Sequence, residues 1–102
     1  MYLTMNRFKV RKEHVEEFEQ VWARRDSHLK SVPGFIGFHL MRGPEGEDHI
    51  LYASHSTWQN KASFEDWTRS EAFRAAHRGA GETRHLYLEQ PKLEIFETVL
   101  EE

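Results

Sequence analysis

Residues 35–58 read FIGFHLMRGPEGEDHILYASHSTW, and this stretch predicts a β-hairpin. Strand-forming residues fill FIGFHLMR at 35–42 and HILYASHSTW at 49–58, whereas GPEGED between them has the glycine, proline and acidic content of a hairpin loop. Two strands joined by so short a connection pair antiparallel. The hairpin therefore forms the middle of the predicted fold.

The segment before the hairpin predicts one strand and one helix. Residues 2–10 alternate loosely between two faces, as a strand does. One face carries Tyr2, Thr4, Asn6, Phe8 and Val10. From about Lys12 to Ser31 the apolar spacing lengthens to the steps of a helix. The apolar face of this helix carries Val15, Phe18, Trp22 and Leu29. Pro33 and Gly34 follow and end the helix.

The segment after the hairpin supplies a second helix and a last strand. Asn60 can cap a helix that begins at Lys61, and KLEIFETVL at 92–100 predicts the strand. The order β-α-β-β-α-β indicates an α+β, ferredoxin-like domain, in which one antiparallel sheet carries both helices on the same face. The other face of the sheet would be open. A homodimer packed sheet to sheet, forming a dimeric α+β barrel, would cover it.

The second helical region, FEDWTRSEAFRAAHRGAG at 64–81, predicts a break. At about 100° per residue, Phe64 and Phe73 would point in nearly opposite directions on one straight helix. A second helix could begin after Ser70, because serine is favoured as the N-terminal cap of a helix. We therefore expect the second helix to be broken near residues 68–70.

Composition limits the classes of function. The 102 residues suffice for a single domain, 1–102, with one core. Charged residues are 30% of the chain with a net charge of −3, and both signs are interspersed, which argues against a nucleic-acid partner. The absence of cysteine excludes thiolate metal sites, thiol nucleophiles and covalent haem attachment through a cysteine motif. No run approaches the ~18 apolar residues of a membrane span, and Asn6, Arg7 and Lys9 interrupt any signal-like start, so we expect a cytoplasmic protein.

His77 has two interpretations. The short helix after the break, over about residues 71–78, would place Phe73 and His77 on a shared side. Gly79 and Gly81 follow, so the imidazole can hydrogen-bond the free carbonyls at the helix end. The other interpretation is a ligand for a metal or cofactor.

Trp67 and Asn6 also have two interpretations each. Trp67 fills the core or an interface, or it forms the wall of a ligand site. Asn6 lies inside a predicted strand, where asparagine is rare. It either marks a bulge or an edge, or it carries a polar task on the inward face.

Four stretches together resemble a known family: MNRFKV, VPGFIGFHLMR, STWQNKASFEDWTRSEAFRAAH and the closing LEIFE. They look like the small haem-degrading monooxygenases similar to the IsdG enzymes, within the antibiotic-biosynthesis-monooxygenase superfamily. The resemblance runs through nearly the whole chain. Its most specific part is a tryptophan followed, after nine residues, by a histidine, together with an asparagine in the first strand. Relatives in the wider superfamily share the fold but generally lack the Trp and His pair.

In that family these residue types form the functional set, and they match Asn6, Trp67 and His77. The resemblance implies that haem b is both cofactor and substrate, and that O2 and electrons from an external donor or reductase open the ring, releasing iron and a biliverdin-like tetrapyrrole. His77 would be the proximal ligand of the haem iron, Asn6 would donate a hydrogen bond to oxygen on the opposite side, and Trp67 would press the ring out of plane. The residues that line the cofactor site, or equally fill the core, are Phe8, Phe64 and Phe73.

Two alternatives compete with this interpretation. One is a cofactor-free monooxygenase that acts on a quinol or aromatic substrate, as in the wider superfamily, and the other is a dimer that binds or buffers haem without turnover. Residues 79–91 predict a loop, in which Arg84 and His85 are either solvated or, together with Arg78, close to the haem propionates. The remaining histidines, among them His14 and His28, are assigned no role.

Overall fold

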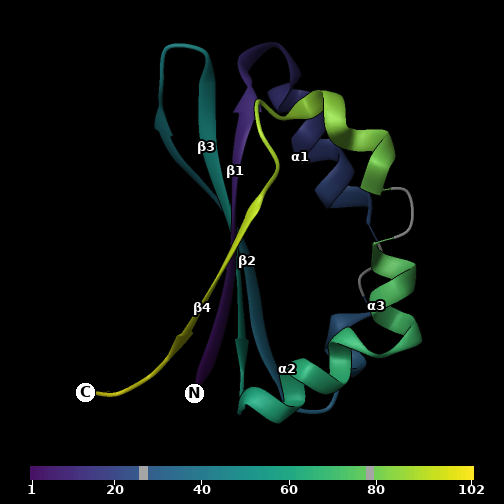
Figure 1. Ribbon diagram of the computed structural model, residues 1–102, viewed down its shortest axis with the longest axis vertical. Helices are drawn as coiled ribbons and strands as arrows, with labels where there is room; N and C mark the ends of the chain where they lie inside the picture. Colours follow the sequence, from purple (N-terminus) through teal and green to yellow (C-terminus); the bar gives the residue numbers. More distant parts are fainter. Residues whose placement is uncertain (26–27, 78–79) are drawn as a thin grey trace.

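The computed structural model describes residues 1–25, 28–77 and 80–102. Within these residues the strands and helices follow the predicted order (Figure 1). The strands are β1 (Tyr2–Arg11), β2 (Phe35–Glu45), β3 (His49–Trp58) and β4 (Lys92–Glu97). The α-helices are α1 (Val15–Arg24), α2 (Lys61–Thr68) and α3 (Glu71–Ala76), and the 3₁₀ turns are η1 (Lys12–His14), η2 (Leu29–Ser31) and η3 (Ala80–Leu86). None of the described helices has the length and apolar character that crossing a membrane requires.

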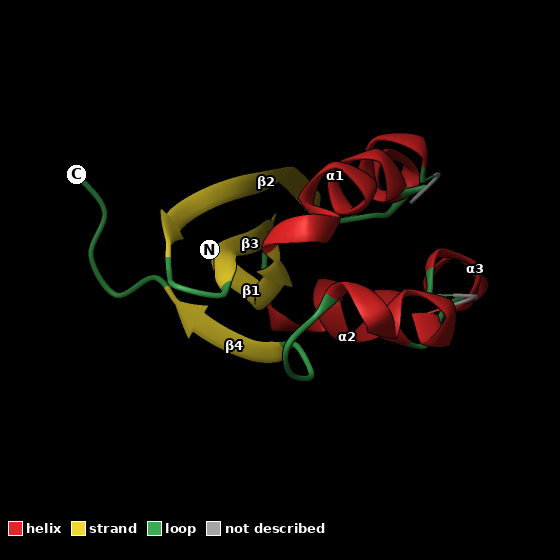
Figure 2. Ribbon diagram, turned by 90° about the horizontal axis from the view of Figure 1, so that it is seen from above, coloured by secondary structure: helices red, strands yellow, loops and turns green. Residues whose placement is uncertain are grey.

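The strands form one antiparallel sheet in the order β2-β3-β1-β4, which confirms the ferredoxin-like arrangement. The described helices lie on one face of it, with α1 on the β2 side and α2 and α3 on the β4 side (Figure 2). Asn6 of β1 is opposite Ser54 of β3 and Leu93 of β4. Directly opposite residues point to the same face of a sheet, and so do alternate residues of one strand. Asn6 therefore lies on the helix-facing side, together with the buried Phe8 and Val10 of the same strand.

The first helical segment is shorter than predicted. The expectation of one helix from about Lys12 to Ser31 is wrong, because α1 ends at Arg24 and η1 and η2 flank it. Arg25 is extended, with φ −74° and ψ 138°, and His28 lies in the left-handed region with φ 58°. The change of direction sends Leu29 into a different part of the core from Phe18.

The predicted break in the second helix is confirmed. Asn60 caps α2, because its Oδ1 accepts a hydrogen bond from the N–H of Ser63 at 2.9 Å. Ser70 caps α3 in the same way: its Oγ accepts from the N–H of Phe73 at 3.1 Å and donates to the carbonyl of Trp67 at 2.6 Å. These bonds satisfy backbone groups at the end of α2 and at the start of α3, so the chain can turn between the two short helices.

Parts of the second half of the chain also differ from the prediction. β2 continues to Glu45 instead of ending at residue 42, and β4 ends at Glu97 instead of residue 100. The segment 79–91, expected to be a loop, contains η3. Leu86 at the end of η3 is fully buried, so the core holds this segment. Arg78 and the first glycine of the predicted loop lie outside the described residues.

The core consists of two clusters on the helix-facing side of the sheet. The first contains Phe8, Val10, Phe18, Tyr52 and Leu86, and the second contains Tyr2, Leu29 and Trp58. Asn6 lies on β1 between the two sets and is half-buried. The apolar core is therefore interrupted at the position of a polar residue.

Candidate functional site

His77 ends α3, and its side chain is exposed. Its Nδ1 lies 2.8 Å from the carbonyl oxygen of Phe73. A carbonyl only accepts, so Nδ1 of a neutral imidazole carries the proton and Nε2 keeps a free lone pair. The Phe73 carbonyl also accepts from the backbone N–H of His77 at 3.1 Å, so the ring bonds a carbonyl that already has a partner, and the other ring nitrogen remains available to a ligand.

Trp67 stands in the middle of a continuous group of aromatic rings. Its centroid lies 5.4 Å from that of Trp58, 4.8 Å from Phe73 and 5.9 Å from His77. Phe73 and His77 are stacked, with centroids 4.1 Å apart. This confirms that Phe73 and His77 share a side of α3. The Trp67 ring therefore connects the buried core to the exposed imidazole.

The indole Nε1 of Trp67 is buried and has no hydrogen-bond partner among the described residues. A buried polar atom of this kind normally finds a partner, and leaving it without one costs about 1–3 kcal/mol. By contrast, Nε1 of the buried Trp58 donates to Oγ1 of Thr4 at 3.3 Å. The unsatisfied donor therefore distinguishes Trp67 from a tryptophan that only fills the core.

Asn6 presents a side-chain amide on the helix-facing side of β1. Within the described ranges no hydrogen bond reaches this amide, although Asn6 is half-buried. Neither a bulge nor an edge explains it, because β1 pairs with β3 and β4 on both sides of Asn6 without a shift. The strand geometry therefore favours the other interpretation, in which the Asn6 side chain has a polar role on the inward face of the sheet.

The three phenylalanines predicted to line the cofactor site lie in different surroundings. Phe64 and Phe73 are partly buried and contact Trp67 directly. Phe8 is buried in the other cluster, where it stacks on Tyr87 with centroids 5.6 Å apart. The structure thus brings Phe64, Phe73, Trp67 and His77 together, while Phe8 is a core residue in the chain as described.

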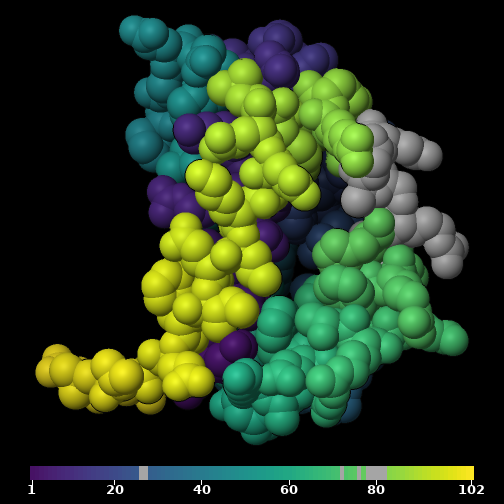
Figure 3. Space-filling view, viewed as in Figure 1, coloured from purple at the N-terminus to yellow at the C-terminus, as the bar shows by residue number. Residues whose placement is uncertain are grey.

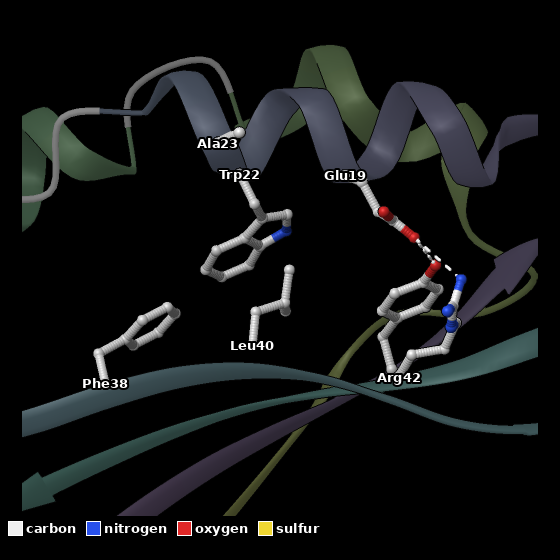
Figure 4. A pocket seen from close by; sticks show the side chains of 7 residues that line it. Glu19, Trp22, Ala23, Phe38, Leu40 and Arg42 are labelled. Atoms are coloured by element: carbon white, nitrogen blue, oxygen red, sulfur yellow. Dashed lines mark hydrogen bonds and ion pairs between the residues drawn. The ribbon is translucent and has the colours of Figure 1, made fainter.

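Sequence reasoning missed a pocket of about 380 Å³ between α1 and β2 (Figure 4). It is lined by Glu19, Trp22, Ala23, Phe38, Leu40, Arg42 and Tyr52. Trp22 and Phe38 stack at one end, 5.7 Å apart, and the guanidinium of Arg25 lies 4.1 Å from the Trp22 centroid. The signals in the sequence were the alternation of Phe38 and Leu40 on one strand and the place of Trp22 on the apolar face of the helix.

The other end of the pocket is polar. The Tyr52 hydroxyl donates to a carboxylate oxygen of Glu19, and Arg42 pairs with the same oxygen at 3.7 Å. Burial, and then the bond to Glu19, raise the pKa of Tyr52 to about 12. Tyr52 therefore stays protonated at neutral pH and acts as a hydrogen-bond donor.

The pocket and Asn6 belong to one cross-strand row. Leu40 of the pocket is opposite Ser54, and Ser54 is opposite Asn6. Strands lie about 4.8 Å apart, so the row spans roughly 10 Å on the helix-facing side. In the space-filling view a hollow lies between β4 and the α2 and α3 segment, and atoms from the first part of the chain lie deeper in it (Figure 3).

The residues considered for the haem propionates are placed differently. Nε2 of His85 lies 2.8 Å from a carboxylate oxygen of Glu17, so this imidazole is already engaged. Arg84 is exposed, and Arg78 lies outside the described residues.

The donor set around α3 fits a haem. It offers an imidazole nitrogen with a free lone pair and a buried indole donor without a described partner, and the sheet adds the amide of Asn6 on its helix-facing side. The aromatic rings of Phe64 and Phe73 give the flat apolar surroundings that a porphyrin requires.

Comparisons with known proteins agree with this geometry. The sequence model of the family described as antibiotic biosynthesis monooxygenase matches residues 1–79. A "heme oxygenase (mycobilin-producing)" from Mycobacterium tuberculosis is 35% identical over 63 residues, which are 62% of this chain. The match spans only 57% of the length of that relative. A "heme-degrading monooxygenase" from Listeria monocytogenes is 32% identical, with 82% of this chain and 75% of the relative covered.

Solved structures extend the likeness to the whole chain. The heme-degrader MhuD from Mycobacterium tuberculosis, solved with two hemes bound in its active site, has a TM-score of 0.74 and 27% identity, covering 99% of this chain and 98% of MhuD. SnoaB from Streptomyces nogalater, a cofactor-independent oxygenase, has a TM-score of 0.72 at 23% identity, covering 98% of this chain and 94% of its own. The second likeness concerns the fold alone.

Proposed function

Because the chain belongs to the antibiotic biosynthesis monooxygenase family, we propose that it is a haem-degrading monooxygenase. The observation that carries the proposal is His77, whose Nδ1 is held by the Phe73 carbonyl and whose Nε2 is free at the end of the aromatic group. Relatives named for heme degradation, at 32% and 35% identity, support it. The bound haem would supply the iron that activates O2, and its own ring would be the substrate.

His77 would hold the haem through Nε2. The hydrogen bond from Nδ1 to the Phe73 carbonyl fixes the tautomer and the ring orientation, which is how an outer partner positions a histidine ligand. The stacked Phe73 ring restricts rotation of the imidazole further. The end of α3 thus holds the imidazole in one tautomer and one orientation.

Asn6 would act from the sheet. Its amide N–H is a neutral donor without a protein partner, on a strand held from both sides. A fixed donor of this kind can stabilise negative charge that develops on oxygen during the reaction. We assign to Asn6 the placement of O2 relative to the ring, and expect it to contribute little to haem affinity.

Trp67 would shape the ring. Trp58, Phe64 and Phe73 support it from three directions, so the indole cannot move aside without disturbing the core. A rigid indole in contact with a bound porphyrin would constrain the shape of the ring, and the protein can alter haem electronics in this way. The unsatisfied Nε1 donor would gain a polar partner when the site is filled.

The proposal is tested by adding hemin to the purified chain, then ascorbate in air with catalase present. Catalase removes free peroxide, so bleaching caused by peroxide in solution is suppressed. We expect a Soret band that saturates and then disappears as tetrapyrrole accumulates. A stable haem spectrum would favour the buffering dimer, and no Soret shift at all would favour a cofactor-free enzyme. His77→Ala and free hemin are the matched controls.

One observation keeps the cofactor-free alternative in view. The pocket between α1 and β2 ends in a hydrogen-bonded group of Glu19, Tyr52 and Arg42, which could bind the hydroxyl groups of a quinol. In that case the Asn6, Trp67 and His77 set would have no role. Oxygen consumption with a quinol and no haem would support this alternative.

We also propose that the working unit is a homodimer. By register, the open face of the sheet carries Leu3, Met5, Met41, Leu51 and Phe96. Met41 and Phe96 are 41% and 50% exposed, and Nδ1 of His55 on this face is buried without a partner among the described residues. A second copy would cover this surface. Sedimentation should show a dimer that Phe96→Glu weakens, whereas a monomer at every concentration would exclude it.

A further inference from the structure

A second group of ligand-type side chains lies away from the aromatic site. His14 at the end of η1, Glu17 in the first turn of α1 and His85 in η3 bring their ligand atoms within 4.8 Å of one another. Nε2 of His85 is 2.8 Å from Oε2 of Glu17, and Nδ1 of His14 is 3.5 Å from Oε1. The two imidazole rings lie edge to face, 5.1 Å apart.

From this geometry we propose a binding site for a divalent transition-metal ion, formed by His14, Glu17 and His85. Two imidazoles and a carboxylate are the protein ligands of many sites that keep one or more positions open for water. Around a tetrahedral Zn²⁺, ligand atoms about 2.0–2.1 Å from the ion are roughly 3.3 Å apart. The contacts of Glu17 with both histidines are already close to that spacing.

The core positions all three ligands. Each one is next in sequence to a member of the same hydrophobic cluster: His14 precedes Val15, Glu17 precedes Phe18 and His85 precedes Leu86. Phe18 and Leu86 are fully buried. The backbone at the three positions is therefore held before any ion binds, although His14 and His85 are 71 positions apart in the chain.

The site is reachable and its charge is suitable. Glu17 and His85 are exposed, and His14 is half-buried. Glu13 and Glu16 add negative charge within one turn of the helix, inside the ~10 Å screening length at 0.1 M salt. Arg84, the cation next to His85, is exposed, and Lys12, two residues before His14, is paired with Glu45 at 3.7 Å.

A bound ion would tie η3 to the start of α1. η3 begins at Ala80, three residues after His77, so the same ion would restrain the chain that follows the proposed haem ligand. The metal site does not depend on haem, because it shares no residue with the Asn6, Trp67 and His77 set.

Calorimetric titration of Zn²⁺ into the untagged, haem-free chain at about pH 7.5, where imidazole is neutral, tests the site. We expect one ion per chain and a loss of affinity of at least about 100-fold in His14→Ala, His85→Ala and Glu17→Gln, since removing even an outer partner costs 10–100-fold. His49→Ala and His77→Ala should bind as the unchanged chain does.

Two results would overturn the proposal. The first is no binding up to about 1 mM Zn²⁺, the weak end of the affinity scale. The second is an affinity that stays within about tenfold in any of the three site variants. Far-UV circular dichroism establishes that each variant is folded, and His85→Gln replaces His85→Ala if the latter is not. Failure of this test leaves the haem proposal untouched, because hemin titration reports on His77 alone.

Discussion

The imidazole of His77 stacks on the ring of Phe73 with centroids 4.1 Å apart, while its Nδ1 is 2.8 Å from the Phe73 carbonyl oxygen. One residue thus fixes both the plane and the tautomer of the histidine. The cap and the ligand are not competing interpretations of His77. The bond from Nδ1 to the Phe73 carbonyl, which also accepts from the His77 N–H at 3.1 Å, leaves Nε2 free for a ligand.

Asn6→Ala should separate binding from turnover. Haem affinity should change by only a few fold, because His77 and the aromatic rings remain. The rate of degradation should fall by about 100-fold, the usual effect of removing one fixed donor. Absorbance-monitored turnover checks this, with Asn60→Ala as a control for lost stability, because Asn60 caps α2, the helix that carries Trp67, and any effect of weakened packing should appear in that variant too. Normal turnover in Asn6→Ala would refute the assigned role.

The two tryptophans that contact each other should respond differently to replacement by phenylalanine. Trp58→Phe should lower the free energy of unfolding by about 1–3 kcal/mol, because Nε1 of Trp58 donates to buried Thr4. Trp67→Phe removes a donor that has no described partner, so the apoprotein should lose less. Urea denaturation measures both. Equal losses, or a larger loss at Trp67, would show that its Nε1 is satisfied in solution.

Trp67→Phe should also slow haem degradation, because a smaller ring presses less on the porphyrin. The NMR shifts of the bound haem should move towards those of a flatter ring. Unchanged shifts would count against the proposed role of the indole.

Tyr52 predicts how stability depends on alkaline pH. Its pKa is raised to about 12, first by burial and then by the bond to Glu19. The unfolded chain would release this proton near pH 10 and the folded chain only near 12, so the free energy of unfolding should fall between these values by up to about 1.4 kcal/mol per pH unit. This contribution is complete below pH 10.

Tyr52→Phe should flatten that dependence in urea denaturation at pH 9 to 11.5. Burial also raises the pKa of Tyr87, so part of the slope should remain. A slope identical to that of the unchanged chain would show that Tyr52 ionises normally.

Ser70→Ala should weaken both the fold and the haem site. The hydroxyl caps α3 and also bonds the Trp67 carbonyl, and losing a cap costs about 1 kcal/mol. Because α3 carries His77, haem affinity should fall a few fold. Ser31→Ala is the control, since that hydroxyl bonds only the exposed carbonyl of His28 and should cost less than about 0.5 kcal/mol. Undiminished haem affinity in Ser70→Ala would show that the Ser70 cap does not contribute to haem binding.

Local signals in the sequence predicted the fold well. The caps at Asn60 and Ser70 were predictable because a capping side chain acts on residues two or three positions away. The early end of α1 was not, because Arg25 and His28 leave helical geometry without a glycine or proline to mark the place. Such a turn depends on tertiary packing, here the burial of Leu29.

In the candidate site, too, contacts between residues close in sequence could be predicted, whereas contacts between distant segments could not. Phe73 and His77 are four positions apart, so their contact follows from helical spacing. The group of His14, Glu17 and His85 and the pocket between α1 and β2 join distant segments, and no local pattern announces them. The roles of Asn6, Trp67 and His77 stay predictions, founded on the family resemblance and supported by unsatisfied or available polar atoms at each position.

Titration of ferric hemin, followed by absorption and resonance Raman spectroscopy, shows whether Nε2 of His77 binds haem iron. We expect a saturable, five-coordinate, histidine-ligated spectrum that His77→Ala abolishes and His85→Ala retains. If the chain shows no such spectrum, or keeps it unchanged in His77→Ala, His77 is not the haem ligand.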